Sequence, residues 1–148
     1  MVFEDSPVTG HNIAEFCKGK NVVLFGVPGA FTPGCSQTHL PSYVERADEL
    51  RSQGIDEIIC VSVNDPFVVS AWGKHHEVEK KGIKMFADTN CEFTKALGLE
   101  IDLSKALGSV RSKRYSMLLE DGVVKQLNVE PDGTGLTCSL AGNIKMRK

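Results

Sequence analysis

A cysteine that follows a strand and a tight loop is the strongest candidate for chemistry in this sequence. Residues 22–25 form an apolar run typical of a buried strand, and residues 28–34 are rich in turn-forming glycine and proline. Thr32 is suited to cap a helix with its hydroxyl and Pro33 to fill the first helical position, so Cys35 falls in the first turn. There the positive end of the helix dipole favours a thiolate. The pattern predicts a nucleophilic cysteine, and the alternative is a buried structural one.

Residues 26–35 read Gly-Val-Pro-Gly-Ala-Phe-Thr-Pro-Gly-Cys and contain the spacing P-x-x-x-T-x-x-C in Pro28, Thr32 and Cys35. This spacing resembles the active-site motif of the peroxiredoxins, and the whole string is similar to their peroxiredoxin 5, or type II, branch. Similar strings follow in order: Ser-Val-Asn-Asp at 62–65, Arg-Tyr-Ser-Met at 114–117 and Asn-Val-Glu-Pro-Asp-Gly-Thr-Gly at 128–135. The resemblance covers nearly the whole chain.

The resemblance implies an atypical two-cysteine thiol peroxidase of antioxidant defence and redox homeostasis. Cys35 would attack the peroxide and become a sulfenic acid, and Cys138 would resolve it as a disulfide within the chain. The implied substrates are hydrogen peroxide and alkyl hydroperoxides, with peroxynitrite as a further candidate. Thioredoxin is the implied reductant, and no metal, flavin or haem is needed. Cys138 follows the turn-rich residues 131–136, which suits a segment that must move.

By the same resemblance, the Thr32 hydroxyl faces the sulfur and the peroxide, and Pro28 shields the thiolate from water. Gly34 permits close approach of the substrate, and the N–H groups of Gly34 and Cys35 are suited to form a cradle for developing oxygen charge. Thr32 could equally be only a helix cap, and Pro28 only the end of a strand.

An arginine supplies the fixed positive charge that a thiolate needs. Arg114 matches the position of the family's active-site arginine, because an aromatic and a small residue follow it. We prefer it to Arg111, although both could belong to a solvated basic patch. His39 lies four residues after Cys35 and is expected to neighbour the site without acting as its base. A Cys35–His39 metal pair is weakly supported, since no further ligand has suitable spacing.

Apolar residues after position 100 resemble the family's wall beside the peroxide channel, and they could equally be core: Leu103, Ala106 and Leu107. Cys60, in an apolar strand, is expected to be buried. It is nevertheless the rival resolving thiol, because plant relatives carry a cysteine at the same separation from the first. Cys17 and Cys91 have no expected role. The histidines at 75 and 76 are expected on an exposed helix face.

Strands alternating with helices, followed by a hairpin and a last helix, predict an α/β fold with a mixed sheet. The resemblance sharpens this to a single thioredoxin-like domain over residues 1–148, lacking a short N-terminal segment that the family usually carries. Strands are expected at 22–27, 57–63, 84–87, 115–119 and 123–129. Helices are expected from Thr32 toward Gln53 with a distortion at Pro41, from Asp65 to about Val78, from Thr89 or Asn90 to Gly98, and after Thr137 or Ser139.

Composition narrows the choice of partners. The 148 residues carry 17 basic and 19 acidic side chains, a net charge of −2, which gives no reason to expect nucleic acid or an anionic membrane. Five scattered cysteines without a C-x-x-C pair favour a reducing compartment over a disulfide scaffold. We expect a cytoplasmic monomer or weak homodimer without a targeting segment, with mitochondrial or peroxisomal forms in the same family.

Two other functions compete with this prediction. One is a one-cysteine peroxidase that uses Cys35 alone and is recycled by glutaredoxin or glutathione. The other is a non-enzymatic thioredoxin-fold interaction or chaperone module whose thiols are incidental.

Overall fold

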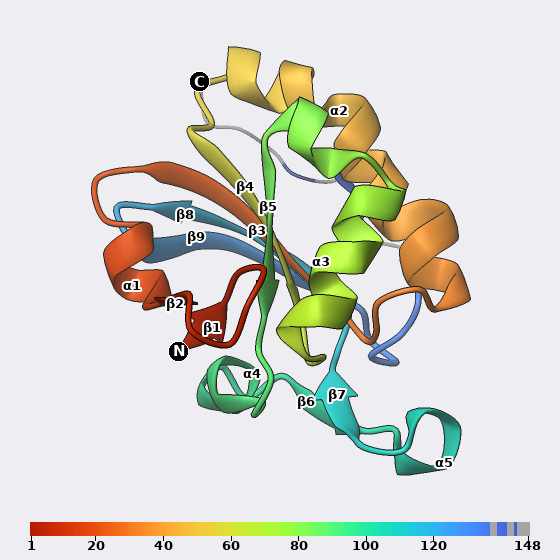
Figure 1. Cartoon of the computed structure of the whole chain (residues 1–148). Helices are drawn as coiled ribbons and strands as arrows, with labels where there is room; N and C mark the ends of the chain where they lie inside the picture. Colours follow the sequence, from red (N-terminus) through yellow and green to blue (C-terminus); the bar gives the residue numbers. More distant parts are fainter. Residues whose placement is uncertain (137–138, 142–143, 145–148) are drawn as a thin grey trace.

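A seven-stranded mixed sheet forms the centre of the computed structural model, which describes residues 1–136, 139–141 and 144 (Figure 1). Its strands are β1 (Val2–Phe3), β2 (Gly10–His11), β3 (Asn21–Val27), β4 (Glu57–Ser62), β5 (Ile83–Ala87), β8 (Tyr115–Glu120) and β9 (Val123–Val129). They lie in the order β2-β1-β5-β4-β3-β8-β9, with β3, β4 and β5 parallel and every other pair antiparallel. The predicted mixed α/β fold is confirmed.

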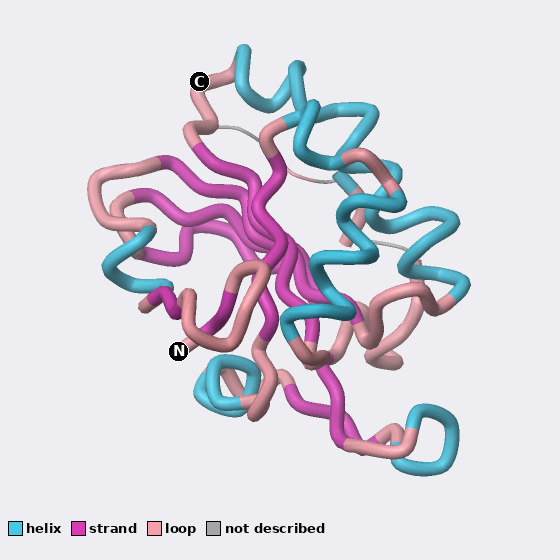
Figure 2. The backbone as a smooth tube through the Cα atoms, in the orientation of Figure 1, coloured by secondary structure: helices cyan, strands magenta, loops and turns pink. Residues whose placement is uncertain are grey.

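Helices surround the sheet (Figure 2). They are α1 (Ile13–Phe16), the π-helix η1 (Cys35–His39), α2 (Leu40–Ser52), α3 (Pro66–His75), the 3₁₀-helix η2 (Val78–Lys81), α4 (Glu92–Ala96) and α5 (Ser104–Leu107). A small second sheet pairs β6 (Glu100–Asp102) with β7 (Val110–Ser112) and, with α5, forms an arm at the bottom of Figure 1. In the described part of the chain, no helix is both long and apolar enough to cross a membrane.

The two faces of the sheet carry separate apolar cores. Alternate residues of β3 point to opposite faces, so Phe25 packs with α2 and α3 whereas Leu24 packs in the cluster that α1 and α4 help to cover. In α2 the buried positions Leu40, Tyr43, Ala47 and Leu50 recur at a spacing of three and four residues and form one face. This burial fixes the long helix against β3 and β4.

The first long helix is distorted, but in the turn before the predicted position, Pro41. It begins at Pro33, widens into the π-helix η1, and continues as α2 from Leu40. Pro41 has no N–H to donate to a carbonyl one turn earlier, and the π-helical turn lies directly before it. Gly54, with φ of +103°, follows the end of the helix. The distortion therefore falls in the turn that begins with Cys35.

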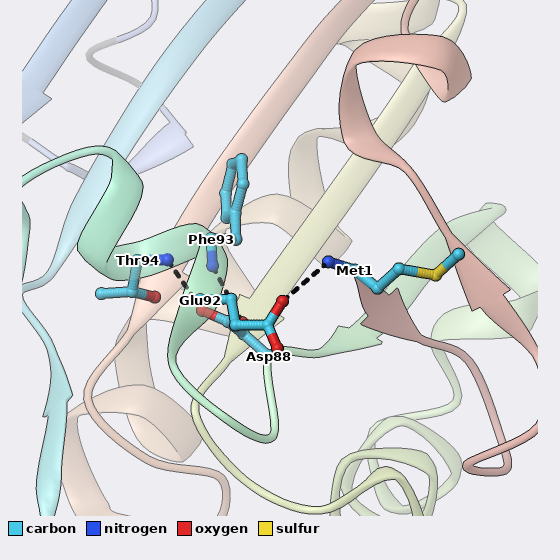
Figure 3. Close-up of polar contacts among 5 residues, drawn as sticks. All are labelled: Met1, Asp88, Glu92, Phe93 and Thr94. Atoms are coloured by element: carbon cyan, nitrogen blue, oxygen red, sulfur yellow. Dashed lines mark hydrogen bonds and ion pairs between the residues drawn. The ribbon is translucent and has the colours of Figure 1, made fainter.

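Two helix boundaries differ from the prediction. Helix α3 starts with the expected Asp65 cap, whose carboxylate accepts the Val68 N–H at 2.9 Å, but it ends at His75. The cap of α4 is neither Thr89 nor Asn90: Figure 3 shows the Asp88 carboxylate accepting the N–H groups of Phe93 and Thr94, at 3.1 and 2.8 Å. Asp88 reaches forward because Cys91 is left-handed, with φ of +61°, and turns the chain back over it.

Two further observations concern the ends of the chain. The Met1 amino group lies 3.4 Å from Glu92 beside the same helix start (Figure 3). The last helix, expected after Thr137 or Ser139, falls largely on residues outside those that the structure describes.

Gly26 sets the distance between β3 and β8. It pairs with Tyr115 in the antiparallel ladder, and a Cβ added to Gly26 would lie 2.1 Å from Cε1 of the Tyr115 ring. The ring is fully buried, so it has little room to move. Gly26 is thus required because an aromatic ring occupies the place of its side chain.

We predict that Gly26→Ala lowers the free energy of unfolding by about 3 kcal/mol, because the new methyl group overlaps the Tyr115 ring. Denaturant unfolding followed by circular dichroism measures the change. Val123→Ala, at a half-exposed position of β9, should change the same quantity by less than about 0.5 kcal/mol. A Gly26→Ala protein as stable as that control would show that the ring can move aside.

Candidate active site

Cys35 lies at the start of the π-helix, fully buried beneath the loop of residues 28–34. Asn64, which follows β4, holds this loop: its Oδ1 accepts the Ala30 N–H at 3.0 Å and the Ser62 hydroxyl. No role was expected for Asn64, although a polar residue two positions after a buried strand is a usable signal. The loop is therefore fixed by the neighbouring parallel strand.

Thr32 does not cap the helix with its hydroxyl, and this part of the prediction is wrong. The Thr32 Oγ1 donates to the Gly29 carbonyl at 2.7 Å, and the Thr32 N–H is directed to the same carbonyl at 3.3 Å. The cap is made by the backbone, since the Thr32 carbonyl accepts the Ser36 N–H at 2.9 Å. Because its hydrogen is taken by Gly29, the hydroxyl offers acceptor lone pairs to its surroundings.

Arg114 reaches the same turn from the start of β8. Its side chain is 3% exposed, and Nε donates to the Thr134 carbonyl at 3.2 Å while Nη1 donates to Nδ1 of His39 at 3.1 Å. The remaining group, Nη2, lies 2.9 Å from the point that a Cβ of Gly34 would occupy. Gly34 therefore admits the guanidinium next to Cys35.

His39 holds Arg114 in place. Its Nε2 donates to the Ser139 carbonyl at 3.1 Å, so the ring carries its proton there and Nδ1 is free to accept from Arg114. Burial, followed by the charge of Arg114, lowers the pKa of His39 to about 3. With both nitrogens engaged, the neutral ring positions the Arg114 guanidinium and has no free lone pair with which to act as a base.

The C-terminal segment closes over this arrangement. Buried Glu130 accepts the Ser139 N–H at 2.8 Å and its hydroxyl at 2.6 Å, and the Tyr43 hydroxyl donates to the Ser139 carbonyl at 2.8 Å. Leu136 lies 3.6 Å from the Cβ position of Gly34. Cys138, the predicted resolving residue, lies outside the described residues.

The remaining predicted site residues differ in how near they lie to the loop of residues 28–34. Pro28 follows β3 directly and is buried. Leu107 and Arg111 both approach Gly29: Cδ1 of Leu107 lies 3.6 Å and Nη1 of Arg111 3.1 Å from the point that a Cβ of Gly29 would occupy. Leu103 is half-buried, and it is not one of the three residues nearest to that point at Gly29.

Cys60 shares the buried core cluster of Cys35 and is fully inaccessible. Burial raises the pKa of the Cys60 thiol well above its ordinary value, and the neighbouring Cys35 adds to this rise. Cys17 and Cys91 are also buried and free.

His76 is not on an exposed face, in contrast to His75. Its Nε2 shares a hydrogen bond of 2.7 Å with the Ser36 hydroxyl, and the oxygen of that hydroxyl accepts the Trp72 indole N–H at 3.3 Å. The pair ties α3 to the turn that carries Cys35. The prediction missed it because Ser36 and His76 lie 40 residues apart in sequence.

Comparison with known proteins agrees with this geometry. The redoxin family matches residues 4–144 of the chain. Peroxiredoxin-2B from Arabidopsis thaliana is 51% identical over 142 residues, which cover 95% of this chain and 86% of that protein. The chain belongs to the type II peroxiredoxins. The family and fold that the motifs indicated are confirmed.

Solved structures of other peroxiredoxins have the same fold. Reduced Prx3 from Vibrio vulnificus, in complex with H2O2, is 46% identical with a TM-score of 0.88, over 96% of this chain and 89% of that chain. Peroxiredoxin 5 from Alvinella pompejana is 45% identical with a TM-score of 0.82, over 90% and 85% of the two chains. As a peroxiredoxin, the protein is a thiol peroxidase of antioxidant defence. This favours the enzyme over the non-enzymatic module.

The neutral state of His39 predicts a pH dependence of stability. Unfolded histidine takes up a proton near pH 6.5, whereas folded His39 takes one up only near pH 3. Between these values the unfolded chain binds more protons, so acidification favours unfolding and stability rises with pH. At pH 5 the loss attributable to His39 is about 2 kcal/mol relative to pH 8.

Denaturant titrations between pH 5 and pH 8 test this, with His39→Asn compared against the unmodified protein. The difference in stability between the two proteins should shrink as the pH falls, because only the unmodified chain loses the contribution of His39. His75→Asn, at an exposed position, is the matched control and should preserve the original pH profile. Parallel profiles for the unmodified protein and His39→Asn would mean that His39 titrates as in the unfolded chain.

Proposed function

We propose that this peroxiredoxin reduces peroxides with Cys35 and closes its cycle through a disulfide between Cys35 and Cys138, which thioredoxin reduces. The observation that carries the proposal is the approach of Arg114 Nη2 to Gly34, directly beside Cys35 in the first turn of the helix. A buried guanidinium next to a thiol is suited to stabilise a thiolate, because it keeps its charge at any physiological pH.

The first step transfers one oxygen atom. The thiolate sulfur attacks the proton-bearing oxygen of ROOH, a sulfur–oxygen bond forms, and the O–O bond breaks. Cys35 becomes a sulfenic acid, and the leaving RO⁻ takes a proton to give ROH, or water from hydrogen peroxide. Sulfur loses two electrons and the peroxide gains them, so no metal, flavin or haem has to take part.

Three groups at the site support this step. The amides of Gly34 and Cys35 lie in the first helical turn, where no intrahelical carbonyl precedes them, and Arg114 Nη2 is directed to the same place. The Thr32 hydroxyl, whose hydrogen is donated to Gly29, can accept the hydrogen of the peroxide. Donors thus meet the oxygen that gains charge, and an acceptor orients the one that carries the proton.

Cys35→Ser tests the assignment of the nucleophile. We expect it to lose peroxide consumption entirely while keeping the circular dichroism spectrum and unfolding midpoint of the original chain, because serine fits the buried position. Peroxide consumption with dithiothreitol as reductant is the measurement, and Cys17→Ser, in the core on the other face of the sheet, is the control. Activity remaining in Cys35→Ser would end the proposal.

The choice of Cys138 as the resolving thiol is supported by its sequence neighbours. Leu136 contacts the Gly34 position, and the Ser139 carbonyl accepts from His39 and Tyr43, so residues on both sides of Cys138 touch the helix turn of Cys35. Cys138 would attack the sulfenic acid sulfur, forming the disulfide and releasing water. Cys60 is a poorer candidate, because its thiol is buried in the core and its pKa is raised.

Cys138→Ser is predicted to consume about one equivalent of peroxide per chain and then to stop when thioredoxin is the reductant. Cys60→Ser, the matched control, should turn over like the original protein. Mass mapping of the oxidised chain should find the link between positions 35 and 138. If Cys138→Ser turns over normally with thioredoxin, the resolving thiol is Cys60 or an external thiol. Turnover with glutaredoxin alone would favour the one-cysteine alternative.

A reducing compartment such as the cytoplasm suits this cycle, since four described cysteines are free thiols. The cycle needs no second subunit, in agreement with a monomer or weak homodimer. Relatives with similar sequences include a chloroplastic peroxiredoxin of rice.

A further inference from the structure

Two arginines reach the loop of residues 28–34, and the function proposed above uses only one of them. Nη2 of Arg114, beside Gly34, has no hydrogen-bond partner among the residues that the structure describes. Arg111 has a parallel arrangement at Gly29: Nε donates to the Ser109 hydroxyl at 2.8 Å and Nη2 to the Leu107 carbonyl at 3.2 Å. Its Nη1 has no acceptor among the described residues and lies over Gly29. The loop thus meets a guanidinium at each of two glycines.

Two apolar groups lie close to the point above Gly29 that Nη1 of Arg111 approaches. The γ-methyl group of Thr32 lies 3.0 Å, and Cδ1 of Leu107 3.6 Å, from the same Cβ position of Gly29 that Nη1 approaches at 3.1 Å. Thr32 is the residue whose hydroxyl is proposed above to accept the hydrogen of the peroxide. Nη1 of Arg111 and the methyl group of Thr32 thus meet at the same point above Gly29, in the loop that leads to Cys35.

Arg111 forms no ion pair within the described part of the chain. No carboxylate in the described ranges lies within ion-pairing distance of it, and it is half-buried rather than fully solvated. Its guanidinium is held by two hydrogen bonds to neutral groups, which orient it without neutralising it. Such a fixed, unpaired guanidinium recognises carboxylates through charge-assisted hydrogen bonds.

We propose that Arg111 is a specificity residue that favours organic hydroperoxides carrying a carboxylate a few carbon atoms away from the O–O bond. This inference rests on the proposed function of Cys35 and names a substrate class for the same site. The carboxylate binds Nη1 of Arg111 above Gly29, the intervening carbons contact Leu107 and the Thr32 methyl group, and the hydroperoxide reaches Cys35. Arg114 acts on the reacting oxygens of every peroxide, whereas Arg111 acts only on those with an anionic tail.

The test compares two probes that differ only in charge, 4-hydroperoxy-4-methylpentanoate and its methyl ester. Stopped-flow measurement of Cys35 oxidation gives a second-order rate constant for each. In the original protein the carboxylate should react faster than the ester, and added salt should reduce this advantage. Arg111→Gln should slow the carboxylate about ten-fold and leave the ester and hydrogen peroxide unchanged.

Lys105→Gln is the matched control, because it removes one positive charge from the exposed surface of the same arm. It should preserve the preference for the carboxylate. The inference is overturned if Arg111→Gln slows both probes equally, as expected for Arg114→Gln, or if it slows neither. It is also overturned if Lys105→Gln removes the preference as fully as Arg111→Gln does. Failure of the proposed function is distinguishable, since the unmodified protein would then oxidise Cys35 with none of the peroxides.

Discussion

The hydrogen bond between the neutral His39 ring and the Arg114 guanidinium is the contact on which the site depends. It can form only while Nδ1 of His39 is unprotonated, and the Ser139 carbonyl ensures this by taking the ring proton on the other side. One imidazole therefore joins the π-helix, the start of β8 and the C-terminal segment. The charge beside Cys35 is placed by a residue that has no charge itself.

The π-helical turn makes this contact possible. Cys35 and His39 are both fully buried, although they are neighbours in a helix whose other side meets solvent. Pro41 follows the turn and cannot donate a backbone hydrogen bond into it, so the wider turn leaves no additional N–H unsatisfied there. The same proline thus marks the end of the distorted turn and the start of regular α2.

The local parts of the fold were predictable, and the long-range parts were not. Asp65 and Pro66 are enough to predict a helix start, and the motif around Cys35 identifies its residues from their spacing. The direction of the Thr32 hydroxyl depends on the turn made by Gly29, which the residue type does not reveal. Ser139, whose carbonyl accepts from His39, lies 100 residues away in the chain, so no local sequence pattern predicts this pair.

Strand pairing explains the roles of two residues that the order of residues in the sequence does not reveal. In the sequence Gly26 is an ordinary interruption of an apolar run, yet the structure needs it because Tyr115 lies opposite it in the ladder. Asn64 was visible as part of a matching string, but its contact with the loop before Cys35 depends on β3 and β4 being parallel neighbours. Roles of this kind come from register, which is set by the whole sheet.

The separation of the two apolar cores has a consequence for the thiols. Cys35 and Cys60 belong to the cluster under α2 and α3, whereas Cys17 belongs to the cluster on the opposite face. A continuous layer of hydrogen-bonded backbone lies between the two clusters, so the sheet keeps their thiols apart. A direct disulfide between Cys35 and Cys17 therefore cannot form while β3 stays paired with its neighbours. The sheet does not separate Cys35 from Cys60, whose reactivity is limited instead by burial and by the raised pKa of its thiol.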